Sequence, residues 1–248
     1  HSAQLDFRTR VEWGDEKDVM LKVAFPVAVR AHEARYEIQF GNLPRPTHRN
    51  TYQDLARFEV AAHRWADLSE ADFGVSLLND CKYGHDALGH VLRLTLLRAS
   101  RSPGKTADVL QTHEFTYSLL PHEGDYTHGT VRAGYELNVP LTAVPARAAV
   151  GPLGAEVSFF GVTGNNVVLE TVKQAEDGSG IILRLYEAHG CRGRRTVSTS
   201  LPVASAVETD LMERQERRLE VRDGWIALDF GPFQIRTVKL QLARTRRR

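Results

Sequence analysis

The stretch from residue 79 to residue 86 carries the side chains best suited to chemistry in this chain. It reads NDCKYGHD, with an amide, carboxylates, an amine, a phenol and an imidazole close together. Loops often carry binding groups, because the elements on either side hold them in place while their side chains stay accessible. A chain reversal alone needs far fewer polar groups. The stretch either lines a polar site or forms a solvated turn.

Two runs of alternating apolar residues flank this polar stretch. Phe73, Val75 and Leu77 precede it, and Leu92 and Leu94 continue the same spacing after it. Alternation with a period of two is typical of strands. The sequence therefore predicts a hairpin over residues 73–97 with the polar stretch at its tip.

No other part of the sequence shows a catalytic motif. The chain contains no HExxH, His-x-His or His-x-Asp pair for zinc, no GxSxG elbow and no phosphate-binding P-loop. His122, Asp125 and His128 crowd one loop and could bind an ion, but their wide spacing around Gly124 favours a solvated loop. His113 begins a predicted strand and is interpreted as a core or rim residue.

Composition limits the possible partners and the compartment. The chain has 248 residues, 42% of them hydrophobic, and a formal charge of +1, so no global field favours nucleic acid or an anionic membrane. No apolar run approaches the roughly 20 residues that span a bilayer. The two cysteines, Cys81 and Cys191, form no CxxC pair, which favours a reducing compartment and a cytoplasmic location.

The first part of the chain predicts strands and loops throughout. Residues 5–25 predict a first hairpin, and residues 41–50 predict a long loop because they are rich in proline and polar residues. Residues 133–139 alternate and predict a strand that ends at Pro140. No segment requires a long helix, so the fold class is all-β.

A change of composition marks a domain boundary. Residues 141–152 are rich in alanine, proline and glycine, and we place the boundary near Ala149, giving domains 1–149 and 150–248. Short predicted strands follow at the spacing of a β-sandwich. In the last one the apolar parity shifts, which predicts a bulge near residues 236–237.

Several runs in both parts resemble the C-terminal region of glycoside hydrolase family 38 α-mannosidases, most closely the cytosolic and bacterial branch. These runs are VEW at 11–13, LKVAFPV at 21–27, QFG at 39–41, RPTHRNT at 45–51, RWADLSE at 64–70, VSLLNDCKYG at 75–84, HEFTYSL at 113–119, VVLETVK at 167–173, AED at 175–177, RLYEA at 184–188 and GPFQI at 231–235.

The resemblance implies a division of labour. Family members carry zinc, the aspartate nucleophile and the acid/base in an N-terminal part that has no counterpart here. It also implies a large mutarotase-like (super)sandwich followed by a smaller β-sandwich. Cys191 departs from the small residue expected after Gly190. The chain starts without an initiator methionine, which favours a fragment of a longer polypeptide.

The predicted function is the non-catalytic C-terminal portion of a retaining α-mannosidase, inactive by itself, with zinc expected only in the catalytic domain. The alternative is a free-standing carbohydrate-binding or interaction module. Expected partners are an α-mannoside or manno-oligosaccharide, the chain's own N-terminal catalytic domain and a homo-oligomeric copy. No catalytic or metal residue is assigned. The residues expected at the substrate-site rim or an interdomain contact are Asn79, Asp80, Lys82, Tyr83, Arg45 and His48.

Overall fold

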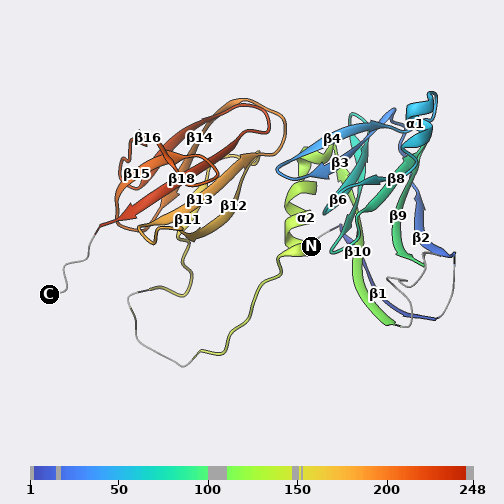
Figure 1. Ribbon diagram of the computed structural model, residues 1–248, viewed down its shortest axis with the longest axis horizontal. Coiled ribbons are helices and arrows are strands. Elements are labelled where there is room, and N and C mark those ends of the chain that lie inside the picture. Colours follow the sequence, from blue (N-terminus) through green and yellow to red (C-terminus); the bar gives the residue numbers. More distant parts are fainter. Residues whose placement is uncertain (1–2, 15–17, 100–110, 147–150, 152, 244–248) are drawn as a thin grey trace. The chain divides into compact units, whose positions relative to one another are not determined.

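The computed structural model describes residues 3–14, 18–99, 111–146, 151 and 153–243 (Figure 1). The chain divides into two compact units, residues 1–142 and 143–248. The boundary predicted at Ala149 lies outside the described residues. The prediction of an all-β fold class is confirmed, because strands dominate both units. No helix among the described residues is long and apolar enough to span a bilayer.

Two antiparallel sheets form the first unit (Figure 1). The six-stranded sheet has the order β1-β10-β7-β6-β3-β4, with β1 (Leu5–Trp13), β10 (Gln111–Glu123), β7 (Phe73–Asn79), β6 (Trp65–Ser69), β3 (Glu33–Ile38) and β4 (Gly41–Pro46). The four-stranded sheet has the order β2-β9-β8-β5, with β2 (Met20–Pro26), β9 (Val91–Arg98), β8 (Gly84–Leu88) and β5 (Val60–Ala61).

Apolar side chains join the inner faces of these two sheets into one core. Leu77 on β7 and Leu94 on β9 are fully buried in it. Aromatic rings cross the interface, since Phe7 on β1 lies 5.5 Å from Phe25 on β2, centroid to centroid, and stacks on Tyr117 of β10 at 5.1 Å. Alternating residues on each strand thus build a sandwich core.

Helix α2 (Thr130–Asn138) covers the other face of the six-stranded sheet and packs on β6 and β7. A chain of buried polar groups lies beneath it. The Ser76 hydroxyl donates to Asp67 at 2.7 Å and lies 2.6 Å from the Thr130 hydroxyl, while His122 Nε2 donates to Asp67 at 2.7 Å. Burial opposes the charge on His122, but the bond and charge of Asp67 outweigh it and raise its pKa.

Gly74 makes room for this buried pair. It lies in register between Ser69 of β6 and His122 of β10. A Cβ at residue 74 would lie 2.3 Å from Ser69 Oγ and 2.4 Å from His122 Cε1. The absence of a side chain on β7 therefore allows the imidazole to reach across that strand to Asp67.

Both predicted hairpins of the first unit are wrong. Strands β1 and β2 pair with β10 and β9 in different sheets, and β7 pairs with β6 and β10. The polar stretch therefore carries the chain from one sheet to the other, and β8 and β9 form their own hairpin. Alternation shows that a strand is half-buried, but it does not show which strand is its neighbour.

Two further elements differ from the prediction. Gly41–Pro46 is an edge strand, where Pro44 and Pro46 are tolerated because a proline at an edge faces away from the ladder. Residues 133–139 belong mainly to α2, whose buried residues Thr130, Val131 and Gly134 follow helical spacing. The short helix α1 (Tyr52–Ala56) follows β4, with the Thr51 side chain accepting a hydrogen bond at its N-terminus.

The second unit is also a two-sheet sandwich. Its three-stranded sheet has the order β11-β14-β17, with β11 (Phe160–Val162), β14 (Gly193–Thr199) and β17 (Trp225–Phe230). Its five-stranded sheet has the order β12-β13-β18-β15-β16, with β12 (Val167–Gln174), β13 (Ile181–Glu187), β18 (Ile235–Leu242), β15 (Val203–Thr209) and β16 (Gln215–Leu219). One apolar cluster fills the space between the sheets.

A buried carboxylate fixes two loops of this unit. Glu187 is fully buried and accepts hydrogen bonds from the backbone N–H groups of His189, Gly190 and Phe233, at 2.8–3.0 Å, and from Asn166 Nδ2 at 3.0 Å. These donors satisfy a charge that burial would otherwise strongly disfavour. The loop holding Cys191 is therefore anchored beside the turn before β18.

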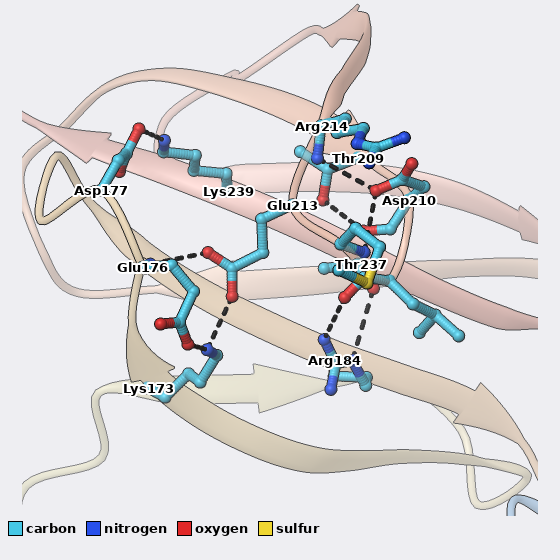
Figure 2. A network of polar contacts seen from close by, with 12 residues as sticks. Lys173, Glu176, Asp177, Arg184, Thr209, Asp210, Glu213, Arg214, Thr237 and Lys239 are labelled. Carbon is cyan, nitrogen blue, oxygen red and sulfur yellow. Dashed lines mark hydrogen bonds and ion pairs between the residues drawn. The ribbon is translucent and has the colours of Figure 1, made fainter.

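A surface network joins two turns of the five-stranded sheet (Figure 2). Glu213, in the β15–β16 turn, accepts a hydrogen bond from Glu176 N at 2.7 Å and pairs with Lys173 Nζ at 2.6 Å. Lys173 holds the pKa of Glu213 below its usual value. Lys239 on β18 pairs with Asp177 at 2.6 Å. The network links the ends of β12 and β15 across the strands between them.

The bulge predicted near residues 236–237 is wrong. The pairing of β13 with β18 runs without a register shift from Ile235 to Leu240. Phe233 lies before the strand, in a turn with φ at 54° in which Gln234 N donates to Gly231 O. The parity shift in the sequence therefore marks the start of the strand. Strand β15 was not predicted.

Replacing Gly74 with alanine should destabilise the first unit. The added methyl must displace Ser69 or His122 from Asp67, and such overpacking costs about 1–3 kcal/mol. We expect a lower melting temperature in calorimetry. Gly154→Ala is the control, because its Cβ would meet only Glu156 O at 3.8 Å. A Gly74→Ala protein as stable as wild type would contradict the packing described here.

The fully buried His85 on β8 predicts a loss of stability in acid. Burial lowers the pKa of His85 to about 4, whereas an unfolded histidine titrates near 6.5. The folded state thus binds fewer protons between these values, so its contribution is complete above about pH 6.5 and is lost as pH falls towards 4.

We expect the unfolding free energy of wild type to fall, relative to His85→Gln, as pH drops from 7 to 4 in urea titrations. His128→Gln, at a histidine whose side chain is 60% exposed, is the control and should track wild type. Parallel curves for wild type and His85→Gln would show that His85 does not carry this pH dependence.

Candidate functional site

Asn79 ends β7 and anchors the polar stretch that follows. Its side chain is almost fully buried. The Nδ2 group donates to His63 O at 2.8 Å, and Oδ1 accepts from Lys82 N at 2.6 Å. Asn79 therefore fixes the shape of the loop, and its side-chain polar atoms bond to backbone groups of the first unit.

Asp80 ties the same loop to β10. Its backbone N donates to Thr116 O at 3.1 Å, and its Oδ2 accepts from Thr116 N at 2.8 Å, so the side chain continues the ladder where β7 ends. The second oxygen, Oδ1, is buried and has no hydrogen-bond partner among the described residues. A buried carboxylate oxygen without a donor is unfavourable, so this position suits a further donor.

Lys82 and Tyr83 form the outer part of the loop. The Lys82 ammonium lies 4.4 Å from the centre of the Phe115 ring, a cation–π geometry. Tyr83 is 56% exposed, and the centre of its ring lies 5.5 Å from that of the His63 ring. These two side chains offer a cation and a flat aromatic face to a ligand or to another part of the protein.

Cys81, between them, is free and exposed but is a poor nucleophile. Burial of the thiol and the neighbouring Asp80 carboxylate raise its pKa to about 11. Reactive cysteines have lowered pKa values, because the thiolate is the attacking species. At neutral pH Cys81 therefore stays a thiol.

An ion pair with a buried carboxylate, Glu37–Arg64, joins the elements behind the loop. Glu37 on β3 is almost fully buried and accepts hydrogen bonds from Arg64 N at 2.7 Å and Arg64 Nε at 3.0 Å. The Arg64 guanidinium lies 3.7 Å from the centre of the Tyr135 ring on α2. Asn138, also on α2, donates to Asn79 O at 2.9 Å. The loop thus rests on a rigid base.

Arg45 and His48 belong to a separate group. They line a small pocket together with Tyr36, Arg49 and Asp54. The six site residues predicted from the sequence thus fall into two sets, one in the loop at residues 79–83 and one beside β4 and α1. Whether either set meets a substrate or a catalytic domain remains a proposal.

Sequence reasoning missed the buried pair of Asp67 and His122. His122 was placed in a solvated loop with Asp125 and His128, whereas it lies in β10, with only 5% of its side chain exposed. The hydroxyls of Ser69 and Ser76 both donate to Asp67, and the second ring nitrogen of His122 lies 3.2 Å from Glu123 O. A histidine base must reach the nucleophile's hydroxyl, so this arrangement does not activate a serine.

A catalytic metal centre finds no support in the part of the chain that the structure describes. No group of three or more His, Cys, Asp or Glu side chains there is placed to hold an ion. Asp125 and His128 lie 3.6 Å apart in an exposed pair, with Thr127 bonded to Asp125. The described residues therefore do not fit a zinc site, and we assign no reaction step to one.

Comparisons with known proteins cover both units. The family model "Glycosyl hydrolases family 38 C-terminal domain" matches residues 1–106, and "Glycosyl hydrolases family 38 C-terminal beta sandwich domain" matches residues 166–238. Alpha-mannosidase 2C1 of Homo sapiens is 50% identical over 242 residues, and the mouse protein of the same name is 49% identical over 243; each alignment covers 95% of this chain and 23% of the relative.

A more distant relative and a solved structure are also named alpha-mannosidases. Alpha-mannosidase G of Dictyostelium discoideum is 39% identical over 245 residues, which is 96% of this chain and 22% of that protein. The crystal structure of an alpha-mannosidase from Enterococcus faecalis V583 has the same fold, with a TM-score of 0.81 at 19% identity, over 97% of this chain and 28% of that one. The chain spans about a quarter of the length of the curated relatives it matches. It belongs to glycosyl hydrolase family 38 and carries the C-terminal domain and the C-terminal β-sandwich domain of that family.

Proposed function

We propose that this chain is the non-catalytic C-terminal part of a retaining α-mannosidase. The observation that carries the proposal is the match of both units to C-terminal domains of one hydrolase family, in relatives named alpha-mannosidases that are about four times longer. Retaining hydrolysis needs a nucleophile and an acid/base about 5 Å apart. In this proposal the missing part supplies both, together with zinc.

The loop at residues 79–83 is the part of this chain that we place at the rim of the sugar site. Tyr83 offers an exposed ring to the apolar face of a pyranose, and Lys82 offers a charge. Asp80 has one buried carboxylate oxygen that no described residue donates to. Asn79 holds the loop in shape from below. Arg45 and His48 are proposed to contact the catalytic domain.

The second candidate function is a free-standing carbohydrate-binding module. It is favoured by Trp225, which is 49% exposed and stands in register with Ser198 and Gly161 on the three-stranded sheet of the second unit. Exposed aromatic rings are the usual platforms for sugars. Calorimetric titration of the chain with mannose and manno-oligosaccharides separates the two functions, because only the module should bind sugar by itself.

Location and assembly belong to the same proposal. A cytoplasmic location is supported by the two cysteines, Cys81 and Cys191, which are both free and exposed. A homo-oligomer of the full-length enzyme remains a proposal that light scattering would test.

We expect the 248-residue chain alone to leave aryl α-mannosides intact and to hold no stoichiometric zinc. The physical reason is that its described residues offer no metal-binding group. An aryl-mannoside assay and metal analysis on the purified chain check this. Turnover at a rate typical of intact glycosidases would overturn the division of labour. If the division of labour is right, the gene upstream of the codon for His1 should encode a His-x-Asp pair and a further aspartate.

In the full-length enzyme, Asp80→Ala or Lys82→Ala should lower kcat/KM roughly ten- to a hundredfold. Removing a charged, partly buried contact costs about 1.5–3 kcal/mol, which corresponds to that range. Zinc content should not change. Arg132→Ala is the matched control, because this α2 side chain is 84% exposed. Kinetics near wild type in both loop variants would remove the loop from the site.

A further inference from the structure

A small cationic pocket lies where the chain passes from one sheet of the first unit to the other. Strand β4 ends one edge of the six-stranded sheet, and β5 ends one edge of the four-stranded sheet. Residues 47–59, with helix α1, connect them. The pocket has a volume of about 20 Å³, which is room for one oxygen atom or one water. Its lining includes Arg45, His48, Arg49, Asp54, Arg57 and Asp86.

Positive charge exceeds negative charge in this lining. Arg45, Arg49 and Arg57 face two carboxylates. Asp86 does not balance them, because its side chain, 7% exposed, is already bonded to Lys22 Nζ at 2.8 Å and Arg93 Nε at 2.6 Å.

The other carboxylate, Asp54, lies 3.8 Å from His48 Nδ1. Within the described residues no carboxylate pairs with Arg45, Arg49 or Arg57. Three arginines that line one small pocket and pair with no carboxylate of the described residues repel one another, and an anion bound in the pocket would relieve that repulsion.

The backbone around Arg45 is restrained by its neighbours. Pro44 and Pro46 restrict the backbone on either side of it, and it pairs in register with Ala34 of β3. Thr47 then fixes the chain by donating through its hydroxyl to Ala31 O at 2.7 Å. The Arg45 Nε is buried and has no hydrogen-bond partner among the described residues. A buried donor without an acceptor is unfavourable, so the position suits an oxygen ligand.

We propose that this pocket binds one oxyanion, a carboxylate or phosphate group, with Arg45 as its inner ligand and Arg49 and Arg57 at its mouth. The volume admits about one oxygen of the anion, and the rest of the ligand lies outside, where both outer arginines are exposed. Planar guanidinium groups match carboxylate and phosphate oxygens in geometry and charge. Phe58, 61% exposed at the same mouth, offers an apolar contact to whatever carries the anion.

This site uses the same Arg45 that is proposed above to contact the catalytic domain, and the 248-residue chain by itself tests whether the pocket binds an anion. The measurement is the NMR resonance of Arg45 Nε–Hε during titrations with sodium acetate and with inorganic phosphate. Sodium chloride at matched ionic strength is the reference. We expect a saturable shift with at least one of the two oxyanions, beyond that in chloride. Tighter binding of acetate indicates an acidic side chain as the natural ligand, and tighter binding of phosphate indicates a phosphorylated molecule; both results support the site.

Two variants keep the inference falsifiable. Arg45→Lys keeps the charge but removes the planar fork, and it should weaken binding about tenfold when binding is followed through the backbone amide of Thr47, which donates to His32 O at 3.0 Å. Because Arg45 is partly buried, a double variant, Arg49→Gln with Arg57→Gln, changes only exposed side chains and should weaken binding several-fold with an unchanged melting temperature. Arg132→Gln on α2 is the control. An Arg45 resonance that moves no more in acetate and phosphate than in chloride would overturn the proposal, as would equal affinity in the double variant.

Discussion

Burial of strand β7 on both faces is the constraint on which the first unit depends. Val75 and Leu77 point into the core between the sheets, while Gly74 and Ser76 lie under α2 among polar groups. A strand covered on both sides must satisfy each polar atom internally, because water cannot reach it. The hydroxyl of Ser76, the carboxylate of Asp67 and the imidazole of His122 do so by bonding to one another.

This double burial also explains why the loop after β7 is a good place for function. Asn79 is the last buried residue of the strand, and the exposed Tyr83 follows it on a base that α2 and the pair of Glu37 and Arg64 hold in place. Side chains on such a base lose little freedom when a ligand binds, which favours affinity. Arg45 should likewise lose little freedom on binding a ligand, because the flanking Pro44 and Pro46 already restrict its backbone.

The sequence revealed the class of the fold and most strands, but not their partners. Alternating residues such as Leu77 and Leu94 identify strands, and their neighbours in the sheet are set by long-range packing that no local pattern contains. The helix over residues 130–138 was predicted as a strand because Ala133, Tyr135 and Leu137 also alternate. The helix packs through Gly134 against Trp65 and through Thr130 against Ser76, which are contacts that no local pattern contains.

The candidate site was predictable in part, for the same reason. The polar stretch at residues 79–84 stands out by composition, and the structure shows which of its groups turn inward. The pair of Asp67 and His122 could not be found, because the two residues are 55 positions apart and neither belongs to a motif. The pair forms only because β6, β7 and β10 align in register and Gly74 leaves space between them, and neither condition can be read from the sequence near these residues.

The two prolines of β4 have a consequence for the behaviour of the protein in solution. A proline in a ladder turns its nitrogen away from the neighbouring strand, so Pro44 and Pro46 place theirs on the open side of the sheet. That side therefore offers carbonyl acceptors but no N–H donors at these two positions. A strand from another molecule cannot complete a ladder there, and this edge of the six-stranded sheet is protected against amyloid-like stacking.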